Sequence, residues 1–250
     1  MNSKYEINTK ENREFLKASC EDLLNFGHRF PSPNGGSYYL GDDGTPWKDR
    51  NRETWITCRM AHVYSLGLML GHEGSGELVD AAMKGLKGEL HDEKNGGWYA
   101  GVTQEGGIVP NKQCYAHAFV ILAASSALTA GRPGAKELLE EALAVYDRHF
   151  WNEEEGLACD TWNTEFTVLD DYRGLNANMH TVEAFLAAGD VSGDKKYHIR
   201  AGRIIDHVIQ WAEDNSWRIP EHFTKEWVAD LDCNRDRPDD PFKPYGATPG

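Results

Sequence analysis

The chain has 250 residues, of which 40% are hydrophobic and 11% aromatic, and its formal net charge is −14. This length can bury the core of one large domain, and this composition excludes a disordered chain. The negative charge argues against nucleic acid and anionic membranes as general partners, although a local arginine could still hold an anionic substrate. No apolar run approaches the roughly 18 residues that a membrane span needs. Five scattered cysteines without a CxxC pair indicate no metal site and no disulfide framework, so we expect a cytoplasmic protein.

Hydrophobic spacing predicts seven helices, at about residues 10–30, 52–71, 76–91, 110–130, 134–150, 176–190 and 194–214. Loops rich in Gly, Asn and aromatic residues separate them. Their turn residues predict a loop or short hairpin at 31–50 and a β-hairpin-like loop at 91–109, and a further aromatic loop covers 150–166. Two helices followed by a loop with Trp, Gly and acidic residues form a recurring layout, in NGGWYAG, EEEGLACDTW and EHFTKEWVA. Such repeats are typical of stacked helix pairs, in an open solenoid or a closed α/α toroid. The aromatic loops favour the toroid, where they could line one shared pocket.

The stretch from Arg173 to Tyr197 reads as a loop that runs into a helix. Asn176 and Asn178 are expected to cap the start of this helix, because an Asn side chain accepts free backbone N–H groups. A histidine and a carboxylate three residues apart, His180 and Glu183, should project the same way. These polar groups suggest the rim of a pocket. The alternative is a capped helix whose histidine bonds a neighbouring backbone.

The chain finishes with PYGATPG, in which Thr248 is a typical N-cap and Pro249 a typical first helical residue. Seven helices in this length imply about 400 residues for six closed helix pairs. We therefore expect residues 1–250 to be the N-terminal portion of a single catalytic toroid whose C-terminal helices are missing. Such a chain should have an exposed apolar flank, which invites association and makes a homo-oligomer possible.

Seven segments carry a resemblance to a known family: WITCRMAHVYSLG, NGGWYAGV, KQCYAHAFVILAASSA, FWNEEEG, YRGLNANMHTVEAFL, EHF and PYGATPG. In this order and spacing the chain resembles the N-acylglucosamine 2-epimerase family, and within it the isomerases of mannose and of sulfoquinovose. The resemblance implies an (α/α)6 barrel, no redox cofactor, and a monosaccharide that is opened to its linear form. It also implies proton transfer through a cis-enediol. Return of the proton to C1 interconverts aldose and ketose, and return to C2 from the other face epimerises the sugar.

The resemblance assigns catalytic roles to two residues. His180 in NANMH matches a pocket histidine with a catalytic or ring-opening role, and histidine supplies a base of near-neutral pKa. Arg59 in WITCRM matches an arginine that contacts sugar oxygens and could stabilise the enediolate. Arg59 could instead be a solvated arginine. Its neighbours Trp55, Met60 and Val63 are apolar, however, and indicate a buried arginine, which would need a partner.

The resemblance also assigns substrate binding to Tyr115 in KQCYAH and to Asn176, while Trp55 is expected to form part of the pocket wall. The alternatives are that Tyr115 and Trp55 belong to the core and that Asn176 is only a helix cap. His62 and His117 are expected to be packing or network residues. His222 is expected to support the pocket together with its neighbour Glu221.

The chain also departs from the family. There, PYGATPG is followed by a catalytic His and Glu, and a further His belongs to the last helices, so the 250-residue chain could itself be inactive. Sulfoquinovose-type enzymes have arginines where this chain has Pro241, Phe242 and Lys243, although Lys243 could hold an anion. Two other functions stay open. One is a glycoside hydrolase that uses two carboxylates, such as Asp160, Asp170 or Asp171. The other is sugar binding without turnover.

Overall fold

The computed structural model describes residues 3–240 and 243–248. In this part of the chain a short 3-10 helix (Ser3–Tyr5) precedes seven α-helices, as many as the hydrophobic spacing predicts. They are α1 (Lys10–Gly27), α2 (Thr54–Met69), α3 (Ser75–Leu86), α4 (Cys114–Thr129), α5 (Ala135–His149), α6 (Leu175–Ser192) and α7 (Lys195–Asp214). The predicted start of the fourth helix near residue 110 is wrong, because residues 111–113 pair with another strand before the helix begins. The third helix ends at Leu86 rather than near residue 91.

Short strands connect the helices. They are β1 (Tyr39–Leu40), β2 (Pro46–Trp47), β3 (Arg52–Glu53), β4 (Gly101–Val102), β5 (Ile108–Val109), β6 (Asn111–Gln113), β7 (Trp151–Asn152), β8 (Leu157–Ala158), β9 (Thr161–Asn163), β10 (Arg173–Gly174), β11 (Ile219–Pro220), β12 (His222–Phe223) and β13 (Ala247–Thr248). All of their pairings are antiparallel. The hairpins β1–β2 and β4–β5 confirm the two predicted hairpin loops, and the aromatic loop at 150–166 also contains a hairpin, β7–β8. Thr248 ends β13, and Pro249 lies outside the described residues.

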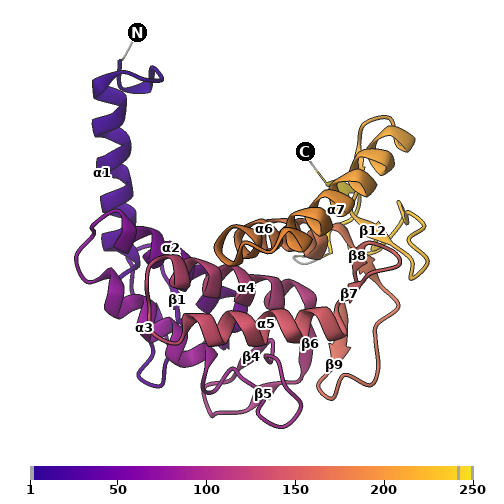
Figure 1. Cartoon of the computed structure of the whole chain (residues 1–250), viewed down its shortest axis with the longest axis horizontal. Helices are drawn as coiled ribbons and strands as arrows, with labels where there is room; N and C mark the ends of the chain where they lie inside the picture. Colours follow the sequence, from indigo (N-terminus) through magenta and orange to yellow (C-terminus); the bar gives the residue numbers. More distant parts are fainter. Residues whose placement is uncertain (1–2, 241–242, 249–250) are drawn as a thin grey trace.

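The helices form two layers (Figure 1). Helices α2, α4 and α6 lie side by side in the inner layer, and α3, α5 and α7 follow them in the outer layer. Helix α4 lies between α2 and α6 and also packs on α5. Its sequence is apolar around the whole helix, and 13 of its residues are buried, because it meets neighbours on several sides. This alternation of inner and outer helices is the expected α/α arrangement.

Each inner helix begins in the same way. The first backbone N–H of the helix donates to a carbonyl that follows in the chain by the same number of residues each time: Thr54 to Ala100 (3.0 Å), Cys114 to Asp160 (2.7 Å) and Leu175 to Glu221 (2.9 Å). The strand before each inner helix pairs with a later strand, as β3–β4, β6–β9 and β10–β12. The repeated layout therefore places the N-terminal ends of α2, α4 and α6 at one end of the molecule.

A buried ion pair holds the loop before α4. The Nζ of Lys112 lies 2.9 Å from Oδ2 of Asp92, and neither side chain is exposed by more than 1%. Lys112 also donates to the carbonyl of Gly96 at 2.8 Å, and Asp92 accepts from Asn95. Burial by itself would raise the pKa of Asp92, but the hydrogen bonds from Asn95 and Lys112 lower it below its usual range. The pair fixes β6, and with it the start of α4.

Two glycine-containing segments touch where the first loop crosses α3. Gly35 and Gly36 lie against Gly85, and a Cβ on Gly85 would stand 2.3 Å from the backbone nitrogen of Gly36. Gly35 also has a φ of +97°, which favours glycine. The backbones can therefore approach only because both sides lack side chains.

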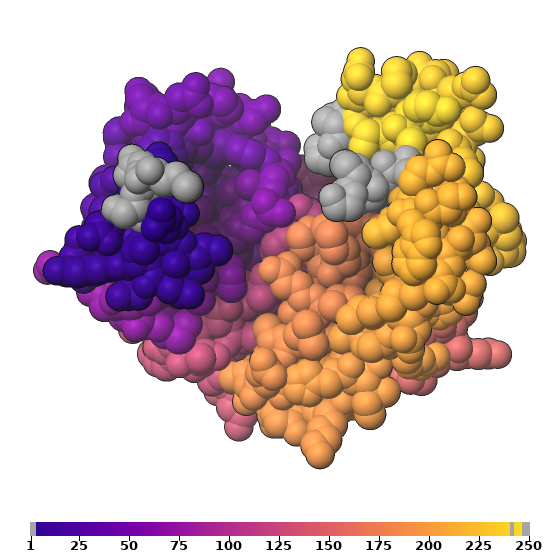
Figure 2. Space-filling model, turned by 90° about the horizontal axis from the view of Figure 1, so that it is seen from above, coloured from indigo at the N-terminus to yellow at the C-terminus, as the bar shows by residue number. Residues whose placement is uncertain are grey.

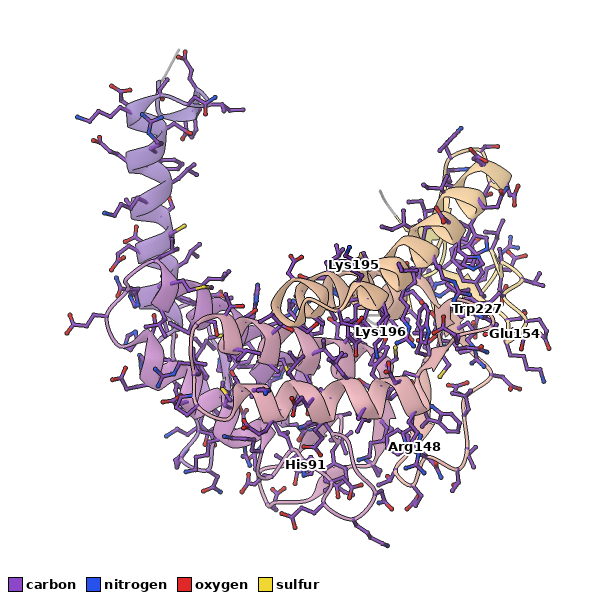
Figure 3. The ribbon with its side chains drawn as sticks, in the orientation of Figure 1. His91, Arg148, Glu154, Lys195, Lys196 and Trp227 are labelled. Carbon is purple, nitrogen blue, oxygen red and sulfur yellow. The ribbon has the colours of Figure 1, made fainter. Side chains whose placement is uncertain are left out.

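Helix α7 is fastened to the 152–156 turn. Arg200 and Arg203 both bind Glu153, at 2.8 and 2.7 Å, and Nε1 of Trp227 donates to Glu155 at 3.1 Å. Figure 3 shows Trp227 beside this turn and Lys196 at the start of the helix. The two arginines therefore join α7 to the turn between β7 and β8, and Trp227 joins the segment after α7 to the same turn.

The row of helices is open at both ends, at α1 and at α7 (Figure 1). Figure 1 shows α1 and α7 projecting to the same side, and Figure 2 shows a hollow between the N-terminal and C-terminal parts. Large apolar side chains are exposed on both edges, and they include Leu23, Val63, Leu66, Leu186 and Ile209. The predicted apolar flank is therefore present, while association through it stays a prediction. Among the described residues, no helix is both long and apolar enough to cross a membrane.

Candidate active site

A cavity of about 470 Å³ lies at the N-terminal ends of the inner helices. Its lining residues are Asn51, Glu53, Trp55, Ala100, Val109, Gln113, Cys114, Tyr115, Asp160, Thr161, Tyr172, Asn176, Ala177 and Lys243. Three predicted substrate-binding residues, Trp55, Tyr115 and Asn176, are thus brought together, one from each inner helix. The volume suits a small ligand such as a monosaccharide.

Arg59 stands beside this cavity, one turn further along α2 than Trp55. Its Nη2 donates to the hydroxyl of Tyr115 at 3.1 Å, and its guanidinium lies 5.1 Å from the ring of Trp55 and 4.7 Å from that of Phe119. The prediction that Arg59 is buried is wrong, because the open side of the inner layer leaves it exposed. The partner that the prediction required is nevertheless present, in the Tyr115 hydroxyl and two aromatic faces.

His180 stands one turn deeper on α6 than Asn176. Its ring centre lies 5.1 Å from that of Tyr115 and 4.6 Å from that of Phe119, and its side chain is 16% exposed. Its Nδ1 is 3.0 Å from Oε2 of Glu183, so this pair projects the same way, as predicted. An ionised carboxylate only accepts, so Nδ1 carries the proton and neutral His180 keeps its lone pair on Nε2.

The predicted caps of α6 are wrong. The N-cap is Gly174, and no side chain caps the helix. Asn178 is instead fully buried, where its amide accepts from the N–H of Ala158 at 2.9 Å and donates to the same residue's carbonyl at 3.0 Å. Asn176 lines the cavity, and it is not the helix cap of the alternative interpretation.

The structure adds polar cavity residues that the sequence did not single out as part of this site. Glu53 precedes α2 and accepts a hydrogen bond from the hydroxyl of Tyr39. The ring nitrogen Nε2 of His222 donates to the carbonyl of Pro244 at 2.6 Å, so Nδ1 accepts from the hydroxyl of Tyr172 at 2.8 Å. His222 therefore forms a hydrogen bond with Tyr172, which lines the cavity, as expected of a residue that supports the pocket. Glu53 and Tyr172 lie in short connecting segments without helical spacing, so no local signal marks them.

Of the three carboxylates proposed for a hydrolase, only Asp160 lines the cavity. Asp170 and Asp171 are exposed and lie outside the lining residues. Oδ2 of Asp160 accepts from the N–H of Gly174 at 2.7 Å. Burial raises the pKa of Asp160 to about 7, against the lowering effects of Gly174 and of nearby cations. A carboxyl of this pKa can carry a proton at neutral pH.

Two further histidines have the packing roles that were predicted. His117 is buried, donates from Nδ1 to the carbonyl of Gln113 at 2.7 Å, and accepts from the N–H of Trp98 at 3.1 Å. Burial lowers its pKa to about 3, so it stays neutral. His62 bonds the hydroxyl of Ser126 at 2.7 Å, and burial lowers its pKa as well. Neither histidine lines the cavity.

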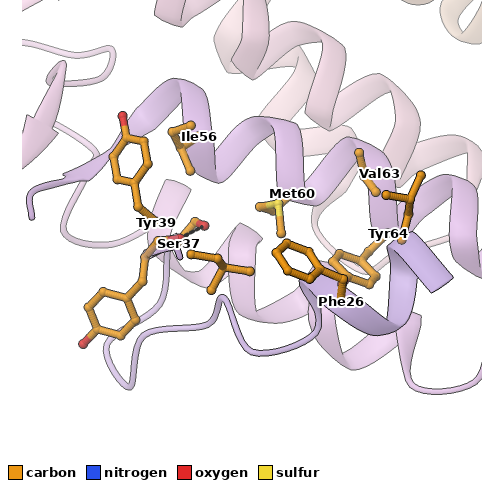
Figure 4. A pocket seen from close by; sticks show the side chains of 11 residues that line it. Phe26, Ser37, Tyr39, Ile56, Met60, Val63 and Tyr64 are labelled. Carbon is orange, nitrogen blue, oxygen red and sulfur yellow. Dashed lines mark hydrogen bonds between the residues drawn. The ribbon is translucent and has the colours of Figure 1, made fainter. Parts of the chain in front are cut away.

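A second pocket of about 270 Å³ lies between α1, the first loop and α2. Figure 4 shows Phe26, Met60 and Tyr64 among its walls. Its lining residues include no charged side chain and no histidine, and their titratable groups are the hydroxyls of three tyrosines. The cavity at the helix ends is therefore the candidate active site. Fold and cavity together define the class, an α/α toroid whose polar, aromatic-walled site has the size of a monosaccharide.

Comparison with known proteins identifies the family. The model of the N-acylglucosamine 2-epimerase (GlcNAc 2-epimerase) family matches residues 35–250, so the chain belongs to that family. A D-mannose isomerase of Thermobifida fusca is 41% identical over 240 residues, which are 95% of this chain and 59% of that protein. The chain thus spans less than two thirds of this relative's length.

Solved structures give the same fold. A crystal structure of D-mannose isomerase matches with a TM-score of 0.86 at 28% identity, over 96% of this chain and 62% of the other. Cellobiose 2-epimerase from Bacillus thermoamylovorans B4167 matches with a TM-score of 0.78 at 21% identity, over 88% and 62% of the two chains. At that identity the second match shows the fold alone. The predictions of the family and of an all-α (α/α)6 toroid are confirmed.

Proposed function

We propose that this chain is the N-terminal part of an aldose–ketose isomerase that interconverts D-mannose and D-fructose. The observation that carries the proposal is that His180 and Arg59, which lie outside the lining residues, both contact Tyr115, which lines the cavity. The similarity to D-mannose isomerases supports the choice of sugar. The missing part of the toroid would supply the remaining walls of the site.

In this mechanism His180 is the base. Nε2 takes the proton from C2 of the linear aldose, and the electrons of the broken C–H bond form the C1–C2 double bond while the carbonyl oxygen becomes an oxyanion. Glu183 accepts from Nδ1, so it stabilises the imidazolium that forms. The proton of the O2 hydroxyl then passes to O1, the C2–O2 bond becomes the carbonyl, and the electrons of the C1–C2 double bond take the proton from His180 at C1, which gives the ketose.

Arg59 and Tyr115 are the donors for the oxyanion. The guanidinium already donates to the Tyr115 hydroxyl, so both groups are held together before a sugar arrives. Donors fixed in advance stabilise a developing charge without further reorganisation. Trp55 offers an aromatic face to the sugar, and Asn176 offers an amide to its hydroxyls.

Epimerisation is the alternative within the same fold. It requires that a second group deliver the proton to C2 from the opposite face, and the epimerase among the solved structures supports only the fold. A sulfonated sugar such as sulfoquinovose is a narrower alternative, for which Lys243 at the cavity could hold the anion. Pro241 and Phe242 lie outside the described residues. We further propose a cytoplasmic location, in line with five free cysteines, and a monosaccharide rather than nucleic acid as partner.

Proton NMR of D-mannose in D2O with the purified chain tests the proposal. We expect the C2 proton signal to be lost as fructose appears, and loss without fructose would instead indicate epimerisation. His180→Asn should lower the exchange rate by about a hundredfold or more. The matched control is His198→Asn, since His198 pairs with Asp190 at 2.9 Å away from the cavity lining. Full exchange in His180→Asn would contradict the assigned role.

A further inference from the structure

Asp160 occupies a place in the cavity that the mechanism above does not use. It directly precedes β9 and shares the cavity wall with Thr161, Tyr172 and Asn176. One carboxyl oxygen, Oδ2, accepts from the N–H of Gly174 at 2.7 Å. The second oxygen, Oδ1, has no hydrogen bond within the described part of the chain, so it can meet a ligand.

The hydrogen bond that links residue 160 to the start of α4 does not involve the carboxyl group of Asp160. The backbone carbonyl of Asp160 accepts from the first N–H of α4, and Ala100 makes the same link to α2 in the preceding repeat. Ala100 lines the same cavity with only a methyl group. The backbone makes this link in all three repeats, at Ala100, Asp160 and Glu221, so the carboxyl group of Asp160 is not needed for it and lies where the cavity is polar.

Titratable and charged groups approach Asp160 from several segments. They are Cys159 on its own strand segment, Asp170, Tyr172 and Arg173 before α6, Cys114 at the start of α4, and Lys243 from the C-terminal loop. Burial raises the pKa of Asp160 to about 7, while the N–H of Gly174, Lys243 and Arg173 act in the opposite direction and Asp170 raises it further. Near neutral pH the carboxyl therefore exists in both its protonated and ionised forms.

We propose that Asp160 is the acid that opens the pyranose ring of the bound sugar. The inference rests on the proposed function, since it assumes a sugar in this cavity. As the C1–O5 bond breaks, O5 takes the proton of the Asp160 carboxyl, C1–O1 becomes the carbonyl, and the proton of the O1 hydroxyl passes to water. Asp160 then recovers a proton from water, so no further reactant is needed.

The position of His180 supports a division of labour. Six residues separate it from Gly174, the residue that binds Asp160, which is roughly 9 Å along a helix axis. The two groups thus reach the sugar at different depths, so Asp160 and His180 would serve different atoms. Ring opening and proton abstraction can then be measured apart.

Ring opening exchanges the α and β anomers, so the test is anomer exchange of D-mannose with the whole 250-residue chain. Two-dimensional exchange NMR gives the rate, from which the rate without protein is subtracted. Asp160→Asn keeps an acceptor for the N–H of Gly174 and should lower the protein-dependent rate by about a hundredfold. The exposed control Asp171→Asn should leave it unchanged.

Each outcome decides one question. Unchanged anomer exchange in Asp160→Asn, or none above background in the unmodified chain, overturns the proposal for Asp160. Anomer exchange that depends on Asp160, without any exchange of the C2 proton, supports Asp160 while the proposed isomerase function fails. If Asp160→Asn does not fold, the pH dependence of anomer exchange is measured with the unmodified chain. The protein-dependent rate should fall about tenfold per pH unit above the Asp160 pKa of about 7. A flat profile from about pH 6 to 8.5 would overturn it.

Discussion

Replacing Lys112 by methionine should destabilise the fold strongly. Lys112 and Asp92 are paired at 2.9 Å with side chains 0% and 1% exposed. Methionine fills a similar volume but leaves the Asp92 carboxylate buried beside an apolar group. Removal of one partner of a buried pair costs about 3–5 kcal/mol. For a chain of this size each kcal/mol shifts the melting temperature by about 2–4 °C, so we expect a fall of roughly 6–20 °C.

The assay is urea and thermal unfolding of Lys112→Met beside Lys136→Met. Lys136 pairs with Glu140 at 3.8 Å, with side chains 70% and 64% exposed, so its replacement should cost at most about 1 kcal/mol. Equal costs for the two variants would refute the argument from burial.

The pH dependence gives a second check on Asp92. Its folded pKa is lowered, so its contribution to stability is present above its unfolded pKa of about 4 and is lost as the pH falls. In Lys112→Met the carboxyl has lost its cation, so protonation relieves the cost of burying it. The unfolding free energies of the unmodified chain and the variant should therefore converge below about pH 4. A difference that stays constant from pH 7 to pH 3 would contradict this reasoning.

Two further predictions concern the site and the packing. Glu183→Gln should remove the preference of His180 for the proton on Nδ1, because a carboxylate that only accepts is replaced by an amide that can also donate. Imidazole ¹⁵N shifts would report the change, and an unaltered Nδ1–H population would count against the assigned tautomer. Gly85→Ala should destabilise the chain despite better helix propensity, since its Cβ would stand 2.3 Å from Gly36. Gly202→Ala, in α7 with nothing within 4 Å of the added Cβ, should stabilise it by up to about 1 kcal/mol, and equal effects in urea unfolding would refute the contact argument.

Much of the fold could be predicted because helices carry a local signal. Apolar spacing marked all seven helices, and the Gly-rich loops marked the hairpins. The start of α4 was misplaced because β6 is stabilised by pairing with β9, which lies some fifty residues further along the chain. Asn178 was mistaken for a cap for a similar reason, since its amide bonds Ala158 in a distant strand. Local sequence cannot show such partners.

The resemblance named residues that lie close together in the structure, while their roles stay predictions. Trp55, Tyr115 and Asn176 meet at one cavity, with Arg59 and His180 beside it. The exposure of Arg59 was missed because apolar neighbours were taken as a sign of burial, although one of them, Val63, is itself exposed. Asp160, Glu53 and Tyr172 come from connecting segments that only the tertiary arrangement brings together.

The common orientation of the inner helices has an electrostatic consequence. A helix carries about half a positive charge at its N-terminus, and acidic residues in the first turn usually offset it. Helices α1, α3 and α5 follow this rule, with Glu11, Glu77 and Glu137, while α7 has no acidic residue in its first turn but is capped by Asp194. The first turns of α2, α4 and α6 contain no acidic residue. Three macrodipoles therefore converge on the cavity, and the acidic side chains that meet them, Glu53 at the N-cap of α2 and Asp160 at the N-cap of α6, belong to the cavity wall and not to the first turns.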